Sequence, residues 1–224
     1  MTSIALPTLV GLILALGGPA LLASPLNRRP GDDDALGPRL ADQFRLLALT
    51  VGVVAMVLWG RRPLASIGWQ GFAWASLAWG CLLAFVFVRV LVPVEGRLLA
   101  RFKLEGFSPG LARLSNLPPG FLIFAALVAG VAEETLLRGY AFTRIAELTG
   151  SQALAGLVTV AIFALAQLRL WGWGAVAAVA VNGAVFTAFF AWRQDLLANI
   201  TAHVLADAIG LIDAAARARR ARPG

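Results

Sequence analysis

Long apolar segments constrain the fold of this chain more than any other feature of its sequence. One of them, "PPGFLIFAALVAGVA" from Pro118 to Ala132, is apolar for more than three helical turns. Several segments approach the ~20 residues that a helix needs to cross a bilayer. A spanning segment must satisfy its backbone hydrogen bonds internally, as a helix does, because lipid offers none. The sequence therefore predicts an all-α fold, a polytopic membrane helix bundle of seven or eight transmembrane helices.

The composition agrees with a membrane protein that forms one compact unit. The chain has 224 residues, of which 59% are hydrophobic and only 14% are charged, whereas soluble domains have about a quarter charged. The net charge of +7 does not predict a nucleic-acid partner, because the basic residues are nearly all arginines in short loops without an aromatic platform. The expected partner is the lipid bilayer. The oligomeric state stays open.

The predicted spans divide the chain into three parts. We expect N-terminal transmembrane helices and loops over 1–114, a core of further spans over 115–213 and a basic tail over 214–224. The first apolar segment lacks a basic n-region, so we interpret it as a span and not as a cleaved signal peptide. We also expect an amphipathic segment on an anionic leaflet at 97–116 and a short interfacial helix at 141–150. The spans are expected at about 4–24, 44–60, 70–95, 118–140, 152–170, 174–192 and 195–213.

The distribution of basic residues predicts the orientation. With seven spans, most arginines fall in the loops near 25–45 and 97–113 and in the C-terminal tail. The positive-inside rule then places the N-terminus outside and the C-terminus in the cytoplasm. The arginine-rich, lysine-poor composition favours a bacterial inner membrane. The single cysteine, Cys81, rules out an internal disulfide.

Charged residues inside a predicted span mark the first candidate site. The stretch "AGVAEETLLRGY" places Glu133, Glu134 and Arg138 in an apolar helix, where ionisable groups are costly. Glu134 and Arg138 are four residues apart and share one helix face, which favours an ion pair. Glu133 lies about 100° around the helix and is free to act as a base. The alternative is a purely structural ion pair, with Glu133 reaching to the membrane surface.

A polar stripe in the last predicted span marks the second candidate site. In "NITAHVLADAIG", Asn199, His203 and Asp207 recur every four residues, and His203 is the only histidine in the chain. Asp207 could hold the imidazole in one tautomer and stabilise a proton on it. The alternatives are that His203 is a hydrogen-bonded packing residue or that the stripe joins helices. A small transporter that uses Glu133, Glu134 and Asp207 as a proton relay is a further alternative.

Other site chemistries have little support in the sequence. The chain has no H-E-x-x-H motif, so a zinc site would need an atypical set such as Glu133, Glu134, His203 and Asp207. We expect no cofactor, while a divalent metal on that set stays open. A nucleophile elbow, a P-loop and a dinucleotide-binding glycine motif are absent from the sequence.

Together the two clusters resemble the CPBP family, also called Abi or CAAX-protease-like intramembrane proteases. That family carries E-E-x-x-x-R, F-x-x-x-H and H-x-x-x-N/D on successive membrane helices. This chain has "EETLLR" from Glu133, followed by "RGY", and "HVLAD" from His203. The resemblance spans roughly residues 115–213. It implies a glutamate-driven intramembrane endopeptidase with its catalytic core over 115–213, which acts on a membrane protein or peptide substrate.

The resemblance implies a role for each matching residue. Glu133 would activate water, Glu134 and Arg138 would support the site, and His203 with Asp207 would stabilise the oxyanion. Where the family has F-x-x-x-H, this chain reads "FALAQ", which ends at Gln167. Glutamine can hydrogen-bond a water but cannot accept its proton.

The departure at Gln167 leaves two possibilities open. The chain is either an active variant that depends on Glu133 or a silent member that acts as a membrane adaptor or chaperone. Counting helical rise over the predicted spans also places Glu133 and Gln167 at different depths in the membrane. Convergence would need the helix at 141–150 to dip inward or the fifth span to begin later.

Overall fold

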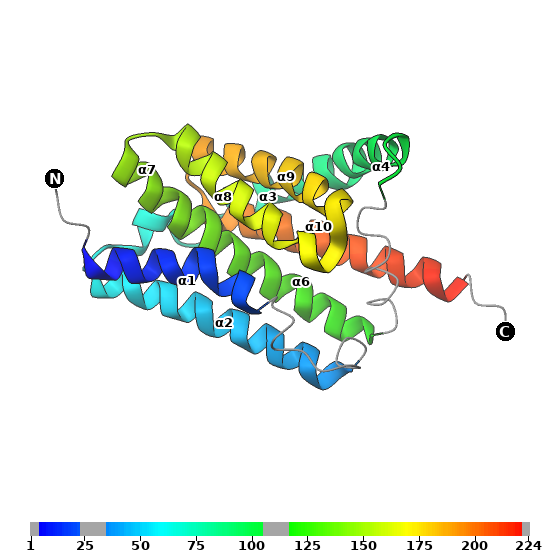
Figure 1. The fold of residues 1–224 in the computed structure, drawn as a ribbon, viewed down its shortest axis with the longest axis horizontal. Helices are drawn as coiled ribbons and strands as arrows, with labels where there is room; N and C mark the ends of the chain where they lie inside the picture. Colours follow the sequence, from blue (N-terminus) through cyan, green and yellow to red (C-terminus); the bar gives the residue numbers. More distant parts are fainter. Residues whose placement is uncertain (1–4, 23–34, 105–116, 221–224) are drawn as a thin grey trace.

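The computed structural model describes residues 5–22, 35–104 and 117–220. In these ranges the backbone forms helices joined by turns and short extended links, without a β-strand. This confirms the prediction of an all-α fold. Figure 1 shows most of the helices lying side by side along the longest axis of the molecule.

Two of the long helices contain a π-helical stretch that leaves the helix continuous. The first stretch joins α3 to α4, and the second joins α6 to α7. In chain order the elements are α1 (Leu6–Leu22), α2 (Leu36–Trp59), the 3-10 turn η3 (Leu64–Ile67), α3 (Trp74–Val86), the π stretch η4 (Phe87–Leu91), α4 (Val92–Arg101), α6 (Pro119–Glu133), the π stretch η5 (Glu134–Phe142), α7 (Thr143–Thr149), α8 (Gln152–Ala166), α9 (Leu168–Arg193, with non-helical dihedrals at Gly172) and α10 (Leu196–Arg220).

Five helices in the described part of the chain are long and apolar enough to cross a membrane. Each predicted span coincides with a helix, but α1 and α8 contribute only shorter apolar helices, Leu6–Pro19 and Gln152–Ala166. The polytopic bundle is therefore confirmed, and the count of seven or eight spans stays a prediction. The five long helices are Leu36–Trp59, Trp74–Arg101, Pro119–Thr149, Gly172–Arg193 and Leu196–Arg217.

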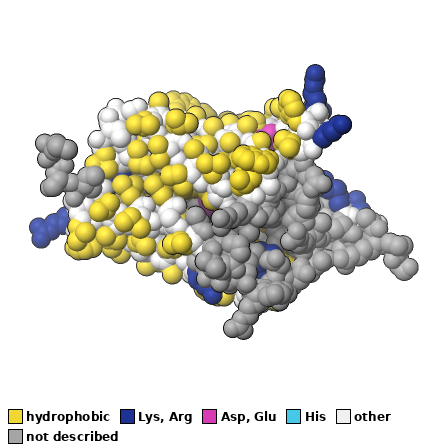
Figure 2. Space-filling view, viewed as in Figure 1, with side chains coloured by type: hydrophobic (Ala, Val, Ile, Leu, Met, Phe, Trp, Pro, Cys, Tyr) yellow, Lys and Arg dark blue, Asp and Glu magenta, His cyan; other side chains and the backbone are white. Residues whose placement is uncertain are grey.

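The outer surface of the bundle is apolar. Figure 2 shows hydrophobic side chains gathered over the described part of the face in view. Large apolar residues are exposed on every long helix, such as Val51 on α2, Phe85 on α3 and Leu127 on α6. An aqueous protein rarely exposes so much contiguous apolar surface, because water disfavours it. This surface fits a lipid environment.

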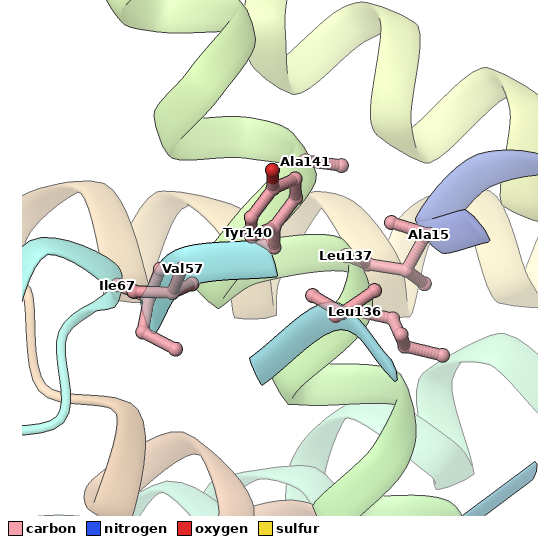
Figure 3. Packing of buried hydrophobic residues seen from close by; sticks show 8 residues of the cluster. Ala15, Val57, Ile67, Leu136, Leu137, Tyr140 and Ala141 are labelled. Atoms are coloured by element: carbon pink, nitrogen blue, oxygen red, sulfur yellow. The ribbon is translucent and has the colours of Figure 1, made fainter. Parts of the chain in front are cut away.

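The N-terminal helices pack directly against the helix that carries the first charged cluster. Figure 3 shows Tyr140 and Leu137 of this helix between Val57 of α2 and Ala15 of α1. The Tyr140 hydroxyl also donates a hydrogen bond to the Pro7 carbonyl at 3.1 Å. Residues before 115 thus build part of the core around the candidate site.

Two helices extend beyond their predicted ends. The predicted short helix at 141–150 is the end of a continuous helix from Pro119 to Thr149, because "YAFT" contains no residue that breaks a helix. The predicted helix end at Gly150 is confirmed, and this glycine adopts the left-handed conformation with φ of 69°. The basic tail is helical as far as Arg220.

The predicted amphipathic segment at 97–116 falls only partly within the described residues. Its first residues complete α4, which ends at Arg101. Residues 105–116 lie outside the described ranges, so the proposed contact of this segment with an anionic leaflet stays a prediction.

Close contact between α6 and α10 provides a test of the packing. An alanine at Gly130 would place its Cβ 2.5 Å from Cγ2 and 3.0 Å from the backbone nitrogen of Val204. We expect Gly130→Ala to lower the free energy of unfolding by about 1–3 kcal/mol, since overpacking forces the helices apart. Gly120→Ala on the same helix is the matched control, because nothing lies within 4 Å of the Cβ that this alanine would add. Unfolding in mixed detergent micelles measures both, and equal stabilities would contradict this packing.

Candidate active site

Three helices bring the two charged clusters of the sequence together. Glu133 ends α6, and Glu134 begins the π-helical stretch η5. His203 lies on α10, which packs along α6 where Gly130 permits close approach. The third helix, α9, contributes Phe186, whose ring stacks on the His203 imidazole with centroids 5.3 Å apart.

Glu134 is the buried centre of the site, with a side-chain exposure of 0%. Its Oε1 accepts a hydrogen bond from Nη1 of Arg138 at 2.8 Å and lies 2.7 Å from Nδ1 of His203. Its Oε2 accepts a hydrogen bond from Nδ2 of Asn199 at 3.1 Å. The predicted Glu134–Arg138 pair is therefore confirmed as a contact. A carboxylate with this many donors is held in place and is poorly suited to collect a further proton.

Arg138 is fixed from the opposite side by α9. Its Nε lies 3.3 Å from Oγ1 of Thr187, and its Nη2 donates to the carbonyl of Gly183 at 3.3 Å. Its guanidinium also lies over the Phe186 ring, 5.5 Å from the centroid. The hydrogen bonds and the aromatic face compensate part of the cost of burying this charge.

Both nitrogens of His203 face carboxylates. Nδ1 contacts Glu134, while Nε2 lies 3.4 Å from Oδ2 of Asp207 and 3.8 Å from Oε2 of Glu133. The sequence suggested Asp207 as the residue that orients the imidazole. The shorter contact belongs to Glu134, because η5 places that carboxylate directly against α10. Asp207 is a second, more distant partner.

Glu133 and Asp207 lie at the edge of the cluster. Their side chains are 22% and 44% exposed, whereas Glu134 is fully buried. The expectation that Glu133 points away from the Glu134–Arg138 pair agrees with this geometry. The Glu133 side of His203 is therefore the more exposed side of the cluster.

Gln167 is the predicted site residue that the contacts do not join to the cluster. It is half-buried at the C-terminal end of α8, and the hydrogen bonds of Glu134 and His203 in the described ranges do not include it. A Cβ at Gly156 would lie 3.9 Å from Phe142, and Phe163 packs against the apolar cluster that contains Leu137 and Tyr140, so α8 packs alongside η5.

The expected difference in depth between Glu133 and Gln167 stays a prediction. The helix that carries Glu133 runs on to Thr149, beyond the predicted span end at 140, and α8 begins at Gln152 as predicted.

The side chains of the site are not grouped as metal ligands in the described residues, where no three His, Cys, Asp or Glu side chains come together in that way. Nδ1 of His203 is already engaged by Glu134. We therefore derive no step through a metal, and the expectation of no cofactor stays a prediction.

Sequence reasoning missed the contribution of α9. Gly183, Phe186 and Thr187 all contact the charged cluster. The available signal was the stretch "NGAVFT" from Asn182, where polar and small residues recur about every four positions in an apolar helix. An aromatic residue inside such a stripe gives no separate sign that it stacks on a histidine.

Comparison with known proteins finds one family model that matches the part of the chain that holds the site. Residues 115–209 match a family model described as type II CAAX prenyl endopeptidase Rce1-like. This region is similar to that family. The match runs from before α6 to beyond Asp207 and includes every candidate site residue. No curated protein and no solved structure matches the chain.

The match confirms the resemblance to CAAX-protease-like proteins. Together with the apolar helices, it supports a membrane endopeptidase in general. Residues 1–114 lie outside the match, although α1 and α2 pack against η5.

Removal of one partner of the buried ion pair should be costly. We expect Arg138→Leu to lower the free energy of unfolding by about 3–5 kcal/mol. The Glu134 carboxylate then stays buried without the cation that its own helix supplies. The exposed pair Arg217–Asp213 provides the control, since Arg217→Leu should change stability by less than ~1 kcal/mol. Both are measured by detergent-induced unfolding. Similar losses for the two variants would mean that the buried pair contributes no more than a surface pair.

Proposed function

We propose that this protein is an intramembrane endopeptidase that hydrolyses peptide bonds of membrane-associated proteins or peptides. The observation that carries the proposal is the distance of 3.8 Å between Oε2 of Glu133 and Nε2 of His203, on the accessible side of a buried and fully paired carboxylate. A base and a hydrogen-bond donor at this separation can act on one water and one carbonyl group.

Glu133 is the proposed general base. In the first step its carboxylate takes a proton from a water molecule as the oxygen attacks the carbonyl carbon of the peptide bond. In the second step the protonated Glu133 returns this proton to the amide nitrogen as the C–N bond breaks. The products are a carboxylic acid and an amine, so atoms and protons balance.

His203 is the proposed oxyanion donor. Because Nδ1 faces Glu134 at 2.7 Å, a neutral imidazole that donates there would present only a lone pair at Nε2. A protonated ring donates from both nitrogens and can stabilise the negative oxygen of the tetrahedral intermediate. Glu134 and Arg138 act as positioning residues in this scheme. Asp207 favours the protonated ring from the Nε2 side, and the substrate oxygen replaces part of that contact.

The proposed setting follows the sequence predictions. The substrate reaches the site from the bilayer, in a bacterial inner membrane, with the N-terminus of the enzyme outside and its C-terminus in the cytoplasm. The exposed apolar surface and the family match support an integral membrane location.

Substitution of Glu133 tests the proposal directly. Glu133→Gln keeps the side-chain volume and removes the base, so we expect the cleavage rate to fall by at least about 10²-fold. Peptide termini in host membranes that express the wild type or the variant at equal level measure the loss. Glu147→Gln is the matched control, because Glu147 pairs with Arg62 and Arg144 at the end of α7. Identical termini in wild type and Glu133→Gln would argue for the silent adaptor instead.

Gln167 separates an active variant from a silent family member. If a proton acceptor at this position assists Glu133, Gln167→His should raise the cleavage rate by about tenfold or more. The same membranes and peptide termini provide the measurement. An unchanged rate in an active wild type would mean that Glu133 works without help from this position. Activity that appears only in Gln167→His would identify a lost function.

A further inference from the structure

A second pair of polar side chains lies half-buried between α4 and α9, apart from the charged cluster. Nδ2 of Asn182 on α9 donates a hydrogen bond to Oε2 of Glu95 on α4 at 3.3 Å. Oε1 of Glu95 and the amide oxygen Oδ1 of Asn182 are buried and have no hydrogen-bond partner among the described residues. Both orphan atoms are acceptors, so the missing partner is a donor. Buried acceptors without a donor cost free energy, which calls for an explanation.

Glu95 ends an otherwise apolar stripe. Leu83, Phe87 and Leu91 precede it at intervals of four residues on one continuous helix, and all three pack in the same apolar cluster. An apolar residue would continue this stripe without cost. The carboxylate in its place is in a membrane-spanning helix, where ionisable groups usually face a partner, a cavity or a substrate path.

The position of Asn182 links this pair to the candidate active site. Asn182 lies one helical turn before Phe186 on α9. The ring of Phe186 stacks on the Phe87 ring, with centroids 4.4 Å apart, and on the His203 imidazole, with centroids 5.3 Å apart. The polar pair is therefore about one turn beyond the aromatic stack that covers His203. A peptide extended from the Glu133–His203 pair would need to pass only a few residues to reach it.

The missing donor should also carry a positive charge. A carboxylate in a low-dielectric interior is stable when a cation pairs with it. The ion pairs of the described residues do not include Glu95, while Arg138 is already paired with Glu134. A water or a peptide N–H could satisfy the two acceptors but would leave the charge of Glu95 unpaired.

We propose that Glu95 and Asn182 form a specificity subsite for a basic side chain, lysine or arginine, a few residues from the bond that is cleaved. An ammonium or guanidinium group brings several N–H donors and one positive charge. It can bond Oε1 of Glu95 and Oδ1 of Asn182 together and so satisfies both acceptors. This inference rests on the proposed function for the location of the peptide.

Paired peptides test the subsite. The probes are quenched-fluorescent peptides with a leucine-rich segment, in which one residue on either side of the scissile bond is lysine, norleucine or glutamate. With wild-type protein in liposomes we expect kcat/KM for lysine to exceed that for norleucine by about tenfold at one position. Glu95→Gln should bring this ratio close to one, and Glu95→Lys should favour glutamate. Glu147→Gln, distant from the subsite, should leave the ratio unchanged.

A second variant, Asn182→Asp, tests the subsite even if Glu95→Gln does not fold. Asn182→Asp adds a second carboxylate to the subsite and should raise the preference for lysine further. Two results would overturn the subsite but not the endopeptidase. The first is cleavage that shows no lysine preference at any tested position. The second is a lysine preference that neither Glu95→Gln nor Asn182→Asp changes.

Binding separates the subsite from catalysis. The same peptides are titrated against Glu133→Gln and against the double variant Glu133→Gln/Glu95→Gln in liposomes. We expect Glu133→Gln to bind the lysine peptide about tenfold more tightly than the norleucine peptide, and the double variant to lose this difference. This result supports the subsite even if the wild type cleaves nothing. In that case only the proposed hydrolysis is overturned. Absence of both cleavage and lysine-selective binding would overturn both proposals.

Discussion

The buried carboxylate of Glu134 is the interaction on which the rest of the site depends. A negative charge inside an apolar bundle is tolerable only when cations and donors surround it. Arg138, His203 and Asn199 meet this requirement from two helices. The requirement fixes the depth of α10 relative to η5, because a shift of one helical turn would separate His203 and Asn199 from Glu134.

Close helix packing makes this network possible. Gly130 lets α10 approach α6, and Gly183 lets the guanidinium of Arg138 reach the backbone of α9. In lipid, helices gain little from the hydrophobic effect against one another, so small residues and polar contacts hold them together. Packing and polar contacts therefore support each other here. The same contacts hold His203 in place, as the proposed electrostatic catalysis would require.

Much of this architecture could be predicted from the sequence. Apolar segments gave the helices and their order, and four-residue spacing gave the Glu134–Arg138 pair and the stripe that contains His203. Helix ends were less certain, because nothing local in "YAFT" distinguishes a turn from a continuing helix. The contacts of Phe186 and Thr187 were not predictable, since they depend on which face of α9 meets the cluster.

The sequence by itself determined that the chain is a membrane helix bundle, because lipid leaves an apolar segment no other way to satisfy its backbone. It also indicated which residues are candidates for chemistry, because charges in such segments are rare and spaced by helical periodicity. Only the tertiary structure decided that Glu134, and not Asp207, is the closest partner of His203. It alone paired Glu95 with Asn182. Both results depend on contacts between helices far apart in the chain, and local periodicity carries no information about such contacts.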